Sequence, residues 1–553
     1  MGGTRVLLEL DLSEAPTDAP PTDPLGFVQA RRRPTLRSVV ETLRDAADDP
    51  KVAGLIGRVG GSMGLARAQE LREAVGGFAK SGKPTVAWAE SFGEGASGTV
   101  AYALATGFGE VWLQPSGDLG LTGVAVEATF LRGALDKVGL EPQFEQRWEY
   151  KNAVDQLSRH GFTEAYREAA SRLAESAYEQ VVDGVAAARQ LPTQRVRELV
   201  DAAPLSAGEA RDAGLVDRIG YRDEVYADVR WRVGEDVRLL FLGRYRRGRA
   251  PARALDRVRR RRRPVVALVT VAGAIQQGRS RRSPLLPTAG AGSDTVGGAL
   301  RSAGRDDAVK AVVLRVDSPG GSYVASDVIW REVEQLRKAG KPVVASMGDV
   351  AASGGYFVSV GADAIVAQPG TITGSIGVYS GKVVTTGLLE RLGIGTDAVV
   401  EGRHARMFSS RVRFDDDEWR RLSEWLDRVY DDFVGKVAEG RGMTRERAHE
   451  LARGRVWSGA DAHERGLVDE LGGLRRAVEL ARERAGLPAA QLRRWPQLRP
   501  TDRLSPPKSS EDRAAAAVWT TDWWSGWGAL AGAAARLGLA PEGPLTLPPL
   551  HLG

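Results

Sequence analysis

The sequence predicts an α/β protein made of two tandem copies of one unit, each with a parallel-rich sheet flanked by helices. Two observations predict this class. Short apolar, β-branched runs alternate with helical segments, which is the pattern of βαβ units. The same series of landmarks also occurs twice along the 553 residues. A repeat of this length indicates two related structural units rather than one.

Matched landmarks define the repeat. A Lys-Pro pair opens an apolar strand at Lys83 and again at Lys341, and the later segment ARDAGLVDRIG is matched by AHERGLVDELG. These matches divide the chain into four parts: a first repeat, 1–235, an arginine-rich linker, 236–263, a second repeat, 264–488, and a partly irregular tail containing Pro and Trp, 489–553.

Each repeat is expected to follow the same order of elements. In the second repeat, strands are expected at 265–273, at 310–316 and after Pro342, and helices are expected between them. These strands lack polar alternation, as strands buried on both faces do. A long helix with apolar residues at spacings of three and four follows Phe414, and its counterpart in the first repeat covers 163–188.

The composition excludes several kinds of chemistry. There is no cysteine, which rules out disulfides, thiolate metal sites and cysteine nucleophiles. The five histidines show no zinc-type pairing, so no metal or other cofactor is expected. The net charge of +6 is concentrated at 244–263. A solvated linker explains this block, and attraction to anionic lipid is the functional alternative. No aromatic platform interleaves with the arginines as nucleic-acid binding would require, so nucleic acid is not an expected partner.

The location is expected to be cytoplasmic or peripheral to a membrane. Glu9 and Asp11 interrupt the first apolar run, so no signal peptide is evident. No stretch reaches the ~18–20 uninterrupted apolar residues of a membrane helix. The Ala- and Trp-rich segment 514–539 is expected to be an interfacial helix, a short helix packed on the body or a loose tail.

Two glycine-rich turns carry the candidate chemistry. DSPGG at 317–321 joins a strand to a helix, and its backbone could form an oxyanion hole or only a tight turn. Ser353 lies among small residues directly before another helix. Such a serine is either an accessible nucleophile or an N-cap. Taken alone, neither turn decides between these interpretations.

Together with two further motifs, these turns resemble the signal peptide peptidase A family in its long, tandem-repeat form. The matching segments are DSPGG (317–321), ASGGY (352–356), TGSIGV (373–378) and EYKNAV (149–154), within a resemblance that covers about 1–488. The resemblance implies a crotonase-like fold related to Clp protease and a serine peptidase acting on signal peptides. It also implies a homo-oligomeric ring.

The resemblance assigns a role to each matched position. The nucleophile falls on Ser353 and the general base on Lys151. Ser375 matches the serine that holds the lysine amine, and Gly320 and Gly354 match the oxyanion-hole positions.

The chemistry of the residues agrees with a Ser/Lys dyad. A serine hydroxyl needs a base to take its proton, and lysine can serve if burial lowers its pKa. Arginine cannot, because it stays protonated in proteins. Lys151 is therefore notable in a chain whose cations are mostly arginine. The alternative is an exposed lysine, or one paired with the neighbouring Glu149.

Each repeat supplies only one member of the dyad. The position corresponding to Lys151 in the second repeat lies near 403–405, where no lysine occurs. The position corresponding to Ser353 in the first repeat lies near Thr99, with Ser97 about two residues out of register. We therefore expect one active site per chain, formed between the two repeats or between neighbouring chains.

Two other functions remain as alternatives. A crotonase-type enzyme acting on acyl-CoA would use a glycine-rich oxyanion hole without a serine nucleophile. An inactive, peptidase-like scaffold would form rings without cleaving peptides. Long family members usually carry an N-terminal membrane anchor, whereas the first repeat here begins almost at residue 1, so we expect a cytoplasmic or peripheral enzyme with soluble peptides among its substrates.

Overall fold

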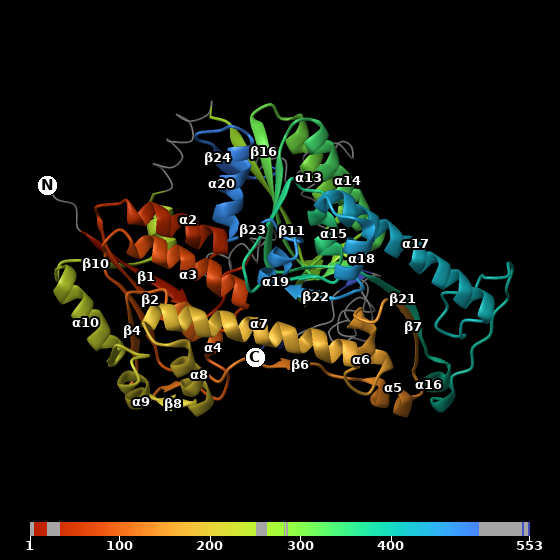
Figure 1. The fold of residues 1–553 in the computed structure, drawn as a ribbon, viewed down its shortest axis with the longest axis horizontal. Coiled ribbons are helices and arrows are strands. Elements are labelled where there is room, and N and C mark those ends of the chain that lie inside the picture. Colours follow the sequence, from red (N-terminus) through yellow and green to blue (C-terminus); the bar gives the residue numbers. More distant parts are fainter. Residues whose placement is uncertain are drawn as a thin grey trace.

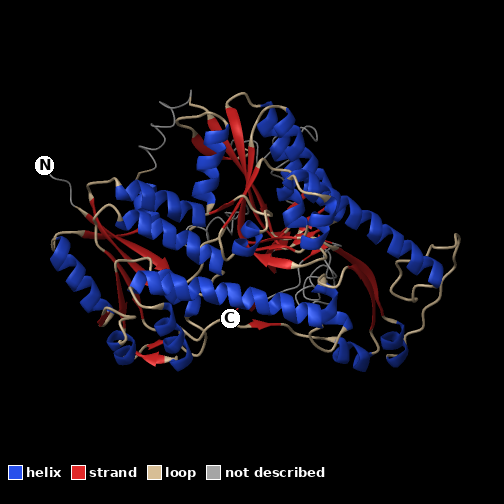
Figure 2. Cartoon of the chain, viewed as in Figure 1, coloured by secondary structure: helices blue, strands red, loops and turns tan. Residues whose placement is uncertain are grey.

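The computed structural model describes residues 5–18, 34–249, 263–280, 282–283, 286–496, 545–546 and 551–552. Two parallel-rich sheets lie apart in the molecule, one from each repeat, and helices cover both (Figures 1 and 2). The predicted α/β class with two tandem repeats is confirmed.

The first sheet has six parallel strands in the order β10-β1-β2-β3-β4-β9. Its strands form a fully parallel sheet because helices cross over between them. In the strand Val52–Val59 the first six residues are all buried, which agrees with the lack of polar alternation in its sequence. The strands are β1 Val6–Leu12, β2 Val52–Val59, β3 Thr85–Ala89, β4 Glu110–Leu113, β9 Arg218–Ile219 and β10 Arg238–Phe241.

The second sheet has eight strands, six of them in the order β22-β20-β18-β16-β11-β24; β19 also pairs with β18, and β23 pairs with β19. All described pairings in it are parallel except that of β20 with β22. The strands are β11 Val265–Ala272, β16 Val309–Ser318, β18 Val343–Ala352, β19 Ala364–Ala367, β20 Ile372–Gly374, β22 Val456–Ser458, β23 Glu470–Leu471 and β24 Gln491–Arg494.

Helices bury both faces of each sheet. One face of the first sheet packs on a large cluster that includes Leu43 and Val75, and the other on a smaller one that includes Val225. The second sheet repeats this arrangement, with Leu480 in its smaller cluster. In the first repeat the helices are α2 Leu36–Ala47, α3 Leu65–Ala79, α4 Thr99–Ala105, α5 Arg132–Val138, the 3-10 turn η1 Asn152–Val154, α6 Asp155–Ser158, α7 Glu164–Arg189, α8 Thr193–Ala202, α9 Ala207–Asp212, α10 Arg222–Val233 and α11 Leu242–Gly248. In the second they are α13 Ser293–Arg305, α14 Tyr323–Lys338, α15 Gly354–Val360, α16 Thr386–Arg391, α17 Asp416–Arg441, α18 Arg445–Leu451, α19 Gly459–Glu464 and α20 Leu474–Arg484.

The two predicted long helices are α7 and α17. Both have 26 residues, and both start with a side-chain N-cap, from Thr163 and Asp415. A residue in the left-handed region ends each of them, Gln190 in one and Gly442 in the other. In Figure 1, α7 runs from the first sheet across the molecule and below the second. It therefore links the bodies of the two repeats.

A pair of strands also crosses between the repeats. β7, Glu141–Arg147, belongs to the first repeat and pairs in antiparallel register with β21, Val378–Val384, of the second. The remaining short strands are β5 Asp118–Leu119 with β8 Leu205–Ser206, β6 Val126–Glu127 with β26 His551–Leu552, β13 Arg282–Ser283 with β14 Leu286–Ala289, and a set formed by β12 Ile275–Gln276, β15 Ala291–Gly292, β17 Gly320–Gly321 and β25 Leu545–Thr546.

The edges of the repeats extend into segments expected to be linker or tail. Part of 236–263 forms β10 and α11, and β10 pairs with β1 of the first sheet. Part of the tail forms β24, which pairs with β11 of the second sheet. Much of the arginine-rich block and the whole Trp-rich segment 514–539 lie outside the described residues. Among the helices in the described ranges, none has both the length and the apolar character needed to span a bilayer.

Candidate active site

The side chains of Lys151, Ser353 and Ser375 meet between the two repeats. Lys151 Nζ lies 2.7 Å from Ser353 Oγ, 3.0 Å from Ser375 Oγ and 2.9 Å from the Ser375 carbonyl oxygen. Lys151 and Ser353 are fully buried, and Ser375 is 1% exposed. The structure therefore brings three of the predicted site residues together within one chain.

Ser353 is held at the end of β18 in a strained conformation. Its φ of 54° and ψ of −114° lie in a region that non-glycine residues rarely adopt. Its backbone N–H donates to the Gly374 carbonyl at 2.8 Å. Although Ser353 stands at the N-cap position of α15, its side chain makes no capping hydrogen bond there. The hydroxyl is directed to Lys151 instead, which argues against the N-cap interpretation of this serine.

Ser375 follows β20 and also has a positive φ, of 51°. Its backbone N–H donates to the carbonyl of Arg455 at 2.7 Å, and Gly454 N–H donates to the Ile376 carbonyl at 2.8 Å. These two bonds fix the turn that carries Ser375. They explain how both the hydroxyl and the carbonyl of one residue come to face the same amine.

Gly454 is a site residue that the sequence analysis missed. Its φ is +83°, and a Cβ atom there would lie 2.4 Å from the backbone nitrogen of Lys151. Only glycine leaves room for the lysine backbone at this distance. The contact joins residues far apart in the chain, and no local motif marks it. The only signal in the sequence is that the matching part of the first repeat has no glycine at the position of Gly454.

The candidate oxyanion residues also lie together. Gly320 is part of β17 and has a φ of +105°. A Cβ atom on Gly354 would lie 3.1 Å from Gly320 Cα and 3.1 Å from the backbone nitrogen of Gly321. The DSPGG turn therefore packs directly against the residue that follows Ser353. The Gly320 N–H donates to Ser318 Oγ at 3.2 Å, a weak bond that a better acceptor could replace.

The pairing of β7 with β21 brings Lys151, which follows β7 in the chain, next to the second repeat. Arg147, the last residue of β7, pairs with Val378, three residues after Ser375. Beyond it, Tyr150 N–H donates to the Arg453 carbonyl at 3.1 Å. Glu149 forms an ion pair with Arg453 and not with Lys151. The alternative of an exposed or salt-bridged lysine at position 151 is therefore wrong.

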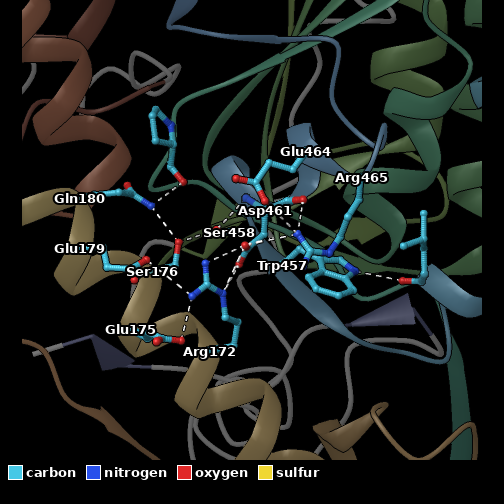
Figure 3. A network of polar contacts seen from close by, with 12 residues as sticks. Arg172, Glu175, Ser176, Glu179, Gln180, Trp457, Ser458, Asp461, Glu464 and Arg465 are labelled. Carbon is cyan, nitrogen blue, oxygen red and sulfur yellow. Dashed lines mark hydrogen bonds and ion pairs between the residues drawn. The ribbon is translucent and has the colours of Figure 1, made fainter. Parts of the chain in front are cut away.

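Helix α7, which follows the segment that carries Lys151, contacts the second repeat through a network of polar side chains (Figure 3). Arg172 contacts both carboxylate oxygens of Asp461 at 3.0–3.3 Å, and Asp461 is only 2% exposed. One turn further along α7, Ser176 Oγ donates to Ser458 Oγ at 2.8 Å. A bidentate arginine–carboxylate pair with a buried partner fixes orientation as well as distance. The network thus holds α7 against β22 and α19.

Burial determines the electrostatics of Lys151. Loss of water lowers the pKa of the Lys151 ammonium well below its usual value, and no charged neighbour opposes the shift. A neutral amine can accept the Ser353 proton, which an ammonium cannot. Within the described ranges, no group of three or more His, Asp or Glu side chains is arranged to hold a metal ion.

The matching positions of the first repeat contain no such site. Thr99, which corresponds to Ser353, is the first residue of α4, and its hydroxyl donates to the Gly123 carbonyl at 2.9 Å. Ser97 is exposed and contacts only Thr99 among the bonds of its side chain. Neither hydroxyl has a lysine partner in the described hydrogen bonds.

Comparison with known proteins identifies the class. The model of Peptidase family S49 matches residues 77–234 and 335–488. The chloroplastic serine protease SPPA of Arabidopsis thaliana is 34% identical over 460 residues, which cover 82% of this chain and 66% of that protein. Protease 4 of Haemophilus influenzae is 32% identical over 467 residues, covering 80% of this chain and 72% of the relative. Among solved structures, a ClpP1 mutant from Listeria monocytogenes is similar over 38% of this chain and 94% of its own, with 16% identity and a TM-score of 0.25.

The matched family model and these relatives define a serine peptidase. More particularly, the chain belongs to peptidase family S49, in the long tandem form of the signal peptide peptidase A type.

Proposed function

We propose that this chain is an endopeptidase that cleaves apolar peptides, signal peptides among them, through a dyad of Ser353 and Lys151. The observation that carries the proposal is the 2.7 Å contact between Lys151 Nζ and Ser353 Oγ in a fully buried setting. A hydrogen-bonded serine and a base with a lowered pKa together meet the requirements for nucleophilic catalysis.

The contacts of Lys151 fit a neutral amine. Such an amine has two N–H donors and one lone pair. The carbonyl and the hydroxyl of Ser375 accept the two N–H groups, at 2.9 and 3.0 Å. The lone pair then faces Ser353 Oγ and accepts its O–H. In this proposal Ser375 orients the base and takes no part in bond making.

The reaction then proceeds in two halves. Lys151 takes the Ser353 proton while Ser353 Oγ attacks the scissile carbonyl carbon, and the N–H groups of Gly320 and Gly354 stabilise the oxyanion. The resulting ammonium of Lys151 protonates the leaving amine, and the C–N bond breaks to leave an acyl-enzyme. Water then attacks the ester, with Lys151 first accepting its proton and then returning one to Ser353 Oγ.

An extended substrate suits the site. Gly320 and Gly321 form the short strand β17, which pairs in antiparallel register with Thr546 and Leu545. A substrate peptide that binds this edge through backbone hydrogen bonds, as strand-like peptides bind sheet edges, must therefore take the place of β25. The preference for apolar signal peptides comes from the family and belongs to the proposal.

A ring of several subunits and a peripheral membrane contact remain predictions. Three apolar side chains in the segment that follows α16 are 63–100% exposed and offer apolar surface to a second copy: Leu392, Val399 and Phe408. Light scattering of the purified chain tests the ring, and sedimentation with anionic vesicles tests the membrane contact.

The decisive experiment is cleavage of a fluorogenic apolar peptide by the wild type, Ser353→Ala and Lys151→Ala. Both variants should lose about 10⁴-fold or more in kcat/KM while keeping the wild-type melting temperature within a few degrees. Thr99→Ala serves as the matched control, because it removes the corresponding hydroxyl of the first repeat. Activity that survives in Ser353→Ala would contradict the proposal.

A further inference from the structure

A group of charged side chains lies between the repeats and is not part of the dyad. We call it the inter-repeat ionic cluster. Asp18, Arg67 and Glu70 come from the first repeat, and Arg315, Asp317 and Asp349 come from the second. One nitrogen of Arg67, Nη2, contacts carboxylates of Asp18 at 2.8 Å, Asp349 at 2.9 Å and Asp317 at 3.2 Å. Arg315 Nη2 contacts Asp18 at 2.9 Å and Glu70 at 3.0 Å.

The cluster also exchanges helix caps between the repeats. Helix α3 of the first repeat begins after Gly64 and has no side-chain cap of its own. Asp349 of the second repeat supplies one, since its Oδ1 accepts the Arg67 backbone N–H at 2.8 Å. A Cβ atom on Gly64 would collide with that carboxylate. Glycine at this position therefore makes room for a cap from the other repeat.

The second half of the exchange runs in the opposite direction. Helix α20 of the second repeat begins after Gly473 and also lacks its own side-chain cap. Glu70 of the first repeat accepts the Leu474 N–H at 3.1 Å, and a Cβ atom on Gly473 would lie 2.7 Å from Glu70 Cγ. Each repeat thus provides a carboxylate for a helix N-terminus of the other, where the free N–H groups favour negative charge.

The two carboxylates of the second repeat stand next to the active site in the chain. Asp349 lies four residues before Ser353 on β18. Asp317 lies three residues before Gly320, at the point where the register of β16 and β18 shifts between Val316 and Ser318. There the Val350 N–H donates to Asp317 Oδ1 at 3.1 Å, so this side chain takes the place of a missing ladder bond.

The shape of this bulge sets where the end of β18 leads. Beyond it, Ser318 is in register with Ala351, two residues before Ser353. Asp317 and Asp349 therefore hold the strand end that presents the nucleophile and the turn that presents Gly320.

Neutralisation of these carboxylates depends on the first repeat. The cluster holds four carboxylates and two guanidinium groups, and the side chains of Arg67, Asp317 and Asp349 are only 17–20% exposed. Arg67 is the one cation of the cluster that contacts both Asp317 and Asp349 in the described ion pairs. Without it, two carboxylates would face each other in a largely water-free space, which is strongly unfavourable.

We propose that Arg67 is a positioning residue for the peptidase site: by binding Asp317 and Asp349 it fixes the strand end of Ser353 and the oxyanion turn relative to the repeat that carries Lys151. This proposal rests on the proposed function. Displacement of reacting groups by ~1 Å is enough to reduce turnover about 100-fold, so a change in this distant contact has a measurable effect on catalysis.

The test compares Arg67→Gln and Arg67→Lys with a matched control, Arg58→Gln. Arg58 pairs with Glu90 inside the first repeat, at 2.5 and 3.2 Å, and does not join the cluster. The readouts are kcat and KM for a fluorogenic apolar peptide, with active sites counted by fluorophosphonate labelling. Labelling also gives the reactivity of Ser353 without a peptide. Ser353→Ala must be inactive in the same assay.

The expected result is a kcat per labelled site at least 10-fold lower in Arg67→Gln, with KM within about 3-fold and a similar loss in labelling rate. Arg67→Lys should recover part of this loss because it retains the charge, and Arg58→Gln should behave as the wild type. A purely structural role would lower the melting temperature and the number of labelled sites but leave kcat per site unchanged, and that result overturns the proposal.

Two safeguards keep the test decisive. If Arg67→Gln does not fold, Arg67→Lys and Asp349→Asn replace it, and wild-type kcat per site in both overturns the proposal. Failure of the proposed function has a different signature, because the activity would then be absent from the wild type or would survive in Ser353→Ala. Normal kcat in the Arg67 variants beside an inactive Ser353→Ala contradicts the positioning role alone.

Discussion

Gly454 lies so close to Lys151 that no side chain fits between them. A Cβ atom at position 454 would stand 2.4 Å from the Lys151 backbone nitrogen and 2.5 Å from its Cβ. The glycine comes from the nucleophile-bearing repeat and the lysine from the other. The position of Lys151 is therefore fixed partly by the repeat that carries Ser353.

This contact predicts that Gly454→Ala displaces the base. The φ of +83° makes any side chain strained by ~1–2 kcal/mol, and the collision adds a shift of the Lys151 backbone. We expect kcat/KM to fall at least 10-fold. Gly442→Ala is the matched control, because Gly442 also has a positive φ, of 60°, but has open space around it. Equal activity in the two variants would show that the close approach does not matter.

The burial of Lys151 predicts the direction of the pH dependence. Only the neutral amine can act as a base, and burial lowers the pKa of Lys151 well below its usual value. The kcat/KM should therefore rise with pH as the ammonium loses its proton, and level off at a pH below the ordinary pKa of lysine, ~10.4. Lys151→Arg should be inactive at every pH, because guanidinium stays protonated. A profile that falls between pH 6 and 9 would argue for another base.

Ser375→Ala should weaken the site without abolishing it. The substitution removes the hydroxyl 3.0 Å from Lys151 Nζ but leaves the Ser375 carbonyl bond at 2.9 Å. Loss of one such bond, at about 1.5–3 kcal/mol for a group that becomes charged, corresponds to about a 10- to 100-fold drop in kcat. The pKa from the pH profile should shift as well. A variant with normal kcat and an unchanged profile would leave Ser375 with a purely backbone role.

Asp317 predicts a pH-dependent stability. Burial, together with the charges of Asp18 and Asp349, raises the pKa of Asp317 to about 7, in spite of Arg67. In the unfolded chain this carboxyl ionises near 3.8, so between about pH 4 and 7 the folded protein holds a proton that the unfolded one has released. Raising the pH through this window therefore lowers the free energy of unfolding.

The measurement is the melting temperature of the wild type and Asp317→Asn at pH 4.5 and pH 7.5. The variant should lose less stability than the wild type across the interval, because its amide does not titrate. Asp397→Asn is the control, since Asp397 is exposed and its carboxylate contacts only a neighbouring backbone N–H. Parallel curves for all three proteins would mean that Asp317 does not titrate in this range.

Local pattern predicts the repeats, and the family resemblance predicts that Ser353 and Lys151 act together, but neither predicts the contacts that join the repeats. The strands and helices of both repeats follow from apolar spacing, and Ser353 and Lys151 lie in motifs that can be recognised without a structure. Arg67 and Gly454 do not lie in a motif that can be recognised from the sequence. Arg67 stands in LARAQELR and looks like a solvent-facing helix residue, because its partners Asp317 and Asp349 come from the other repeat.

The boundaries of the repeats were also set by distant pairing. Residues 238–241 follow a polar stretch and precede the arginine-rich block, so their composition favours a linker. They form a strand because the edge of β1 is available to them in parallel register. The same holds for 491–494, which extend the second sheet beside β11. Whether such a four-residue segment forms an edge strand depends on the strand with which it can pair.

The division of the proposed dyad between the two repeats has a consequence for biosynthesis. The lysine leaves the ribosome long before the serine, and neither half contains a complete set of reacting groups. If Ser353 and Lys151 form the dyad, a growing chain is expected to be inactive until both repeats have folded and docked. In the proposed mechanism, docking of the two repeats is therefore the step that completes the active site.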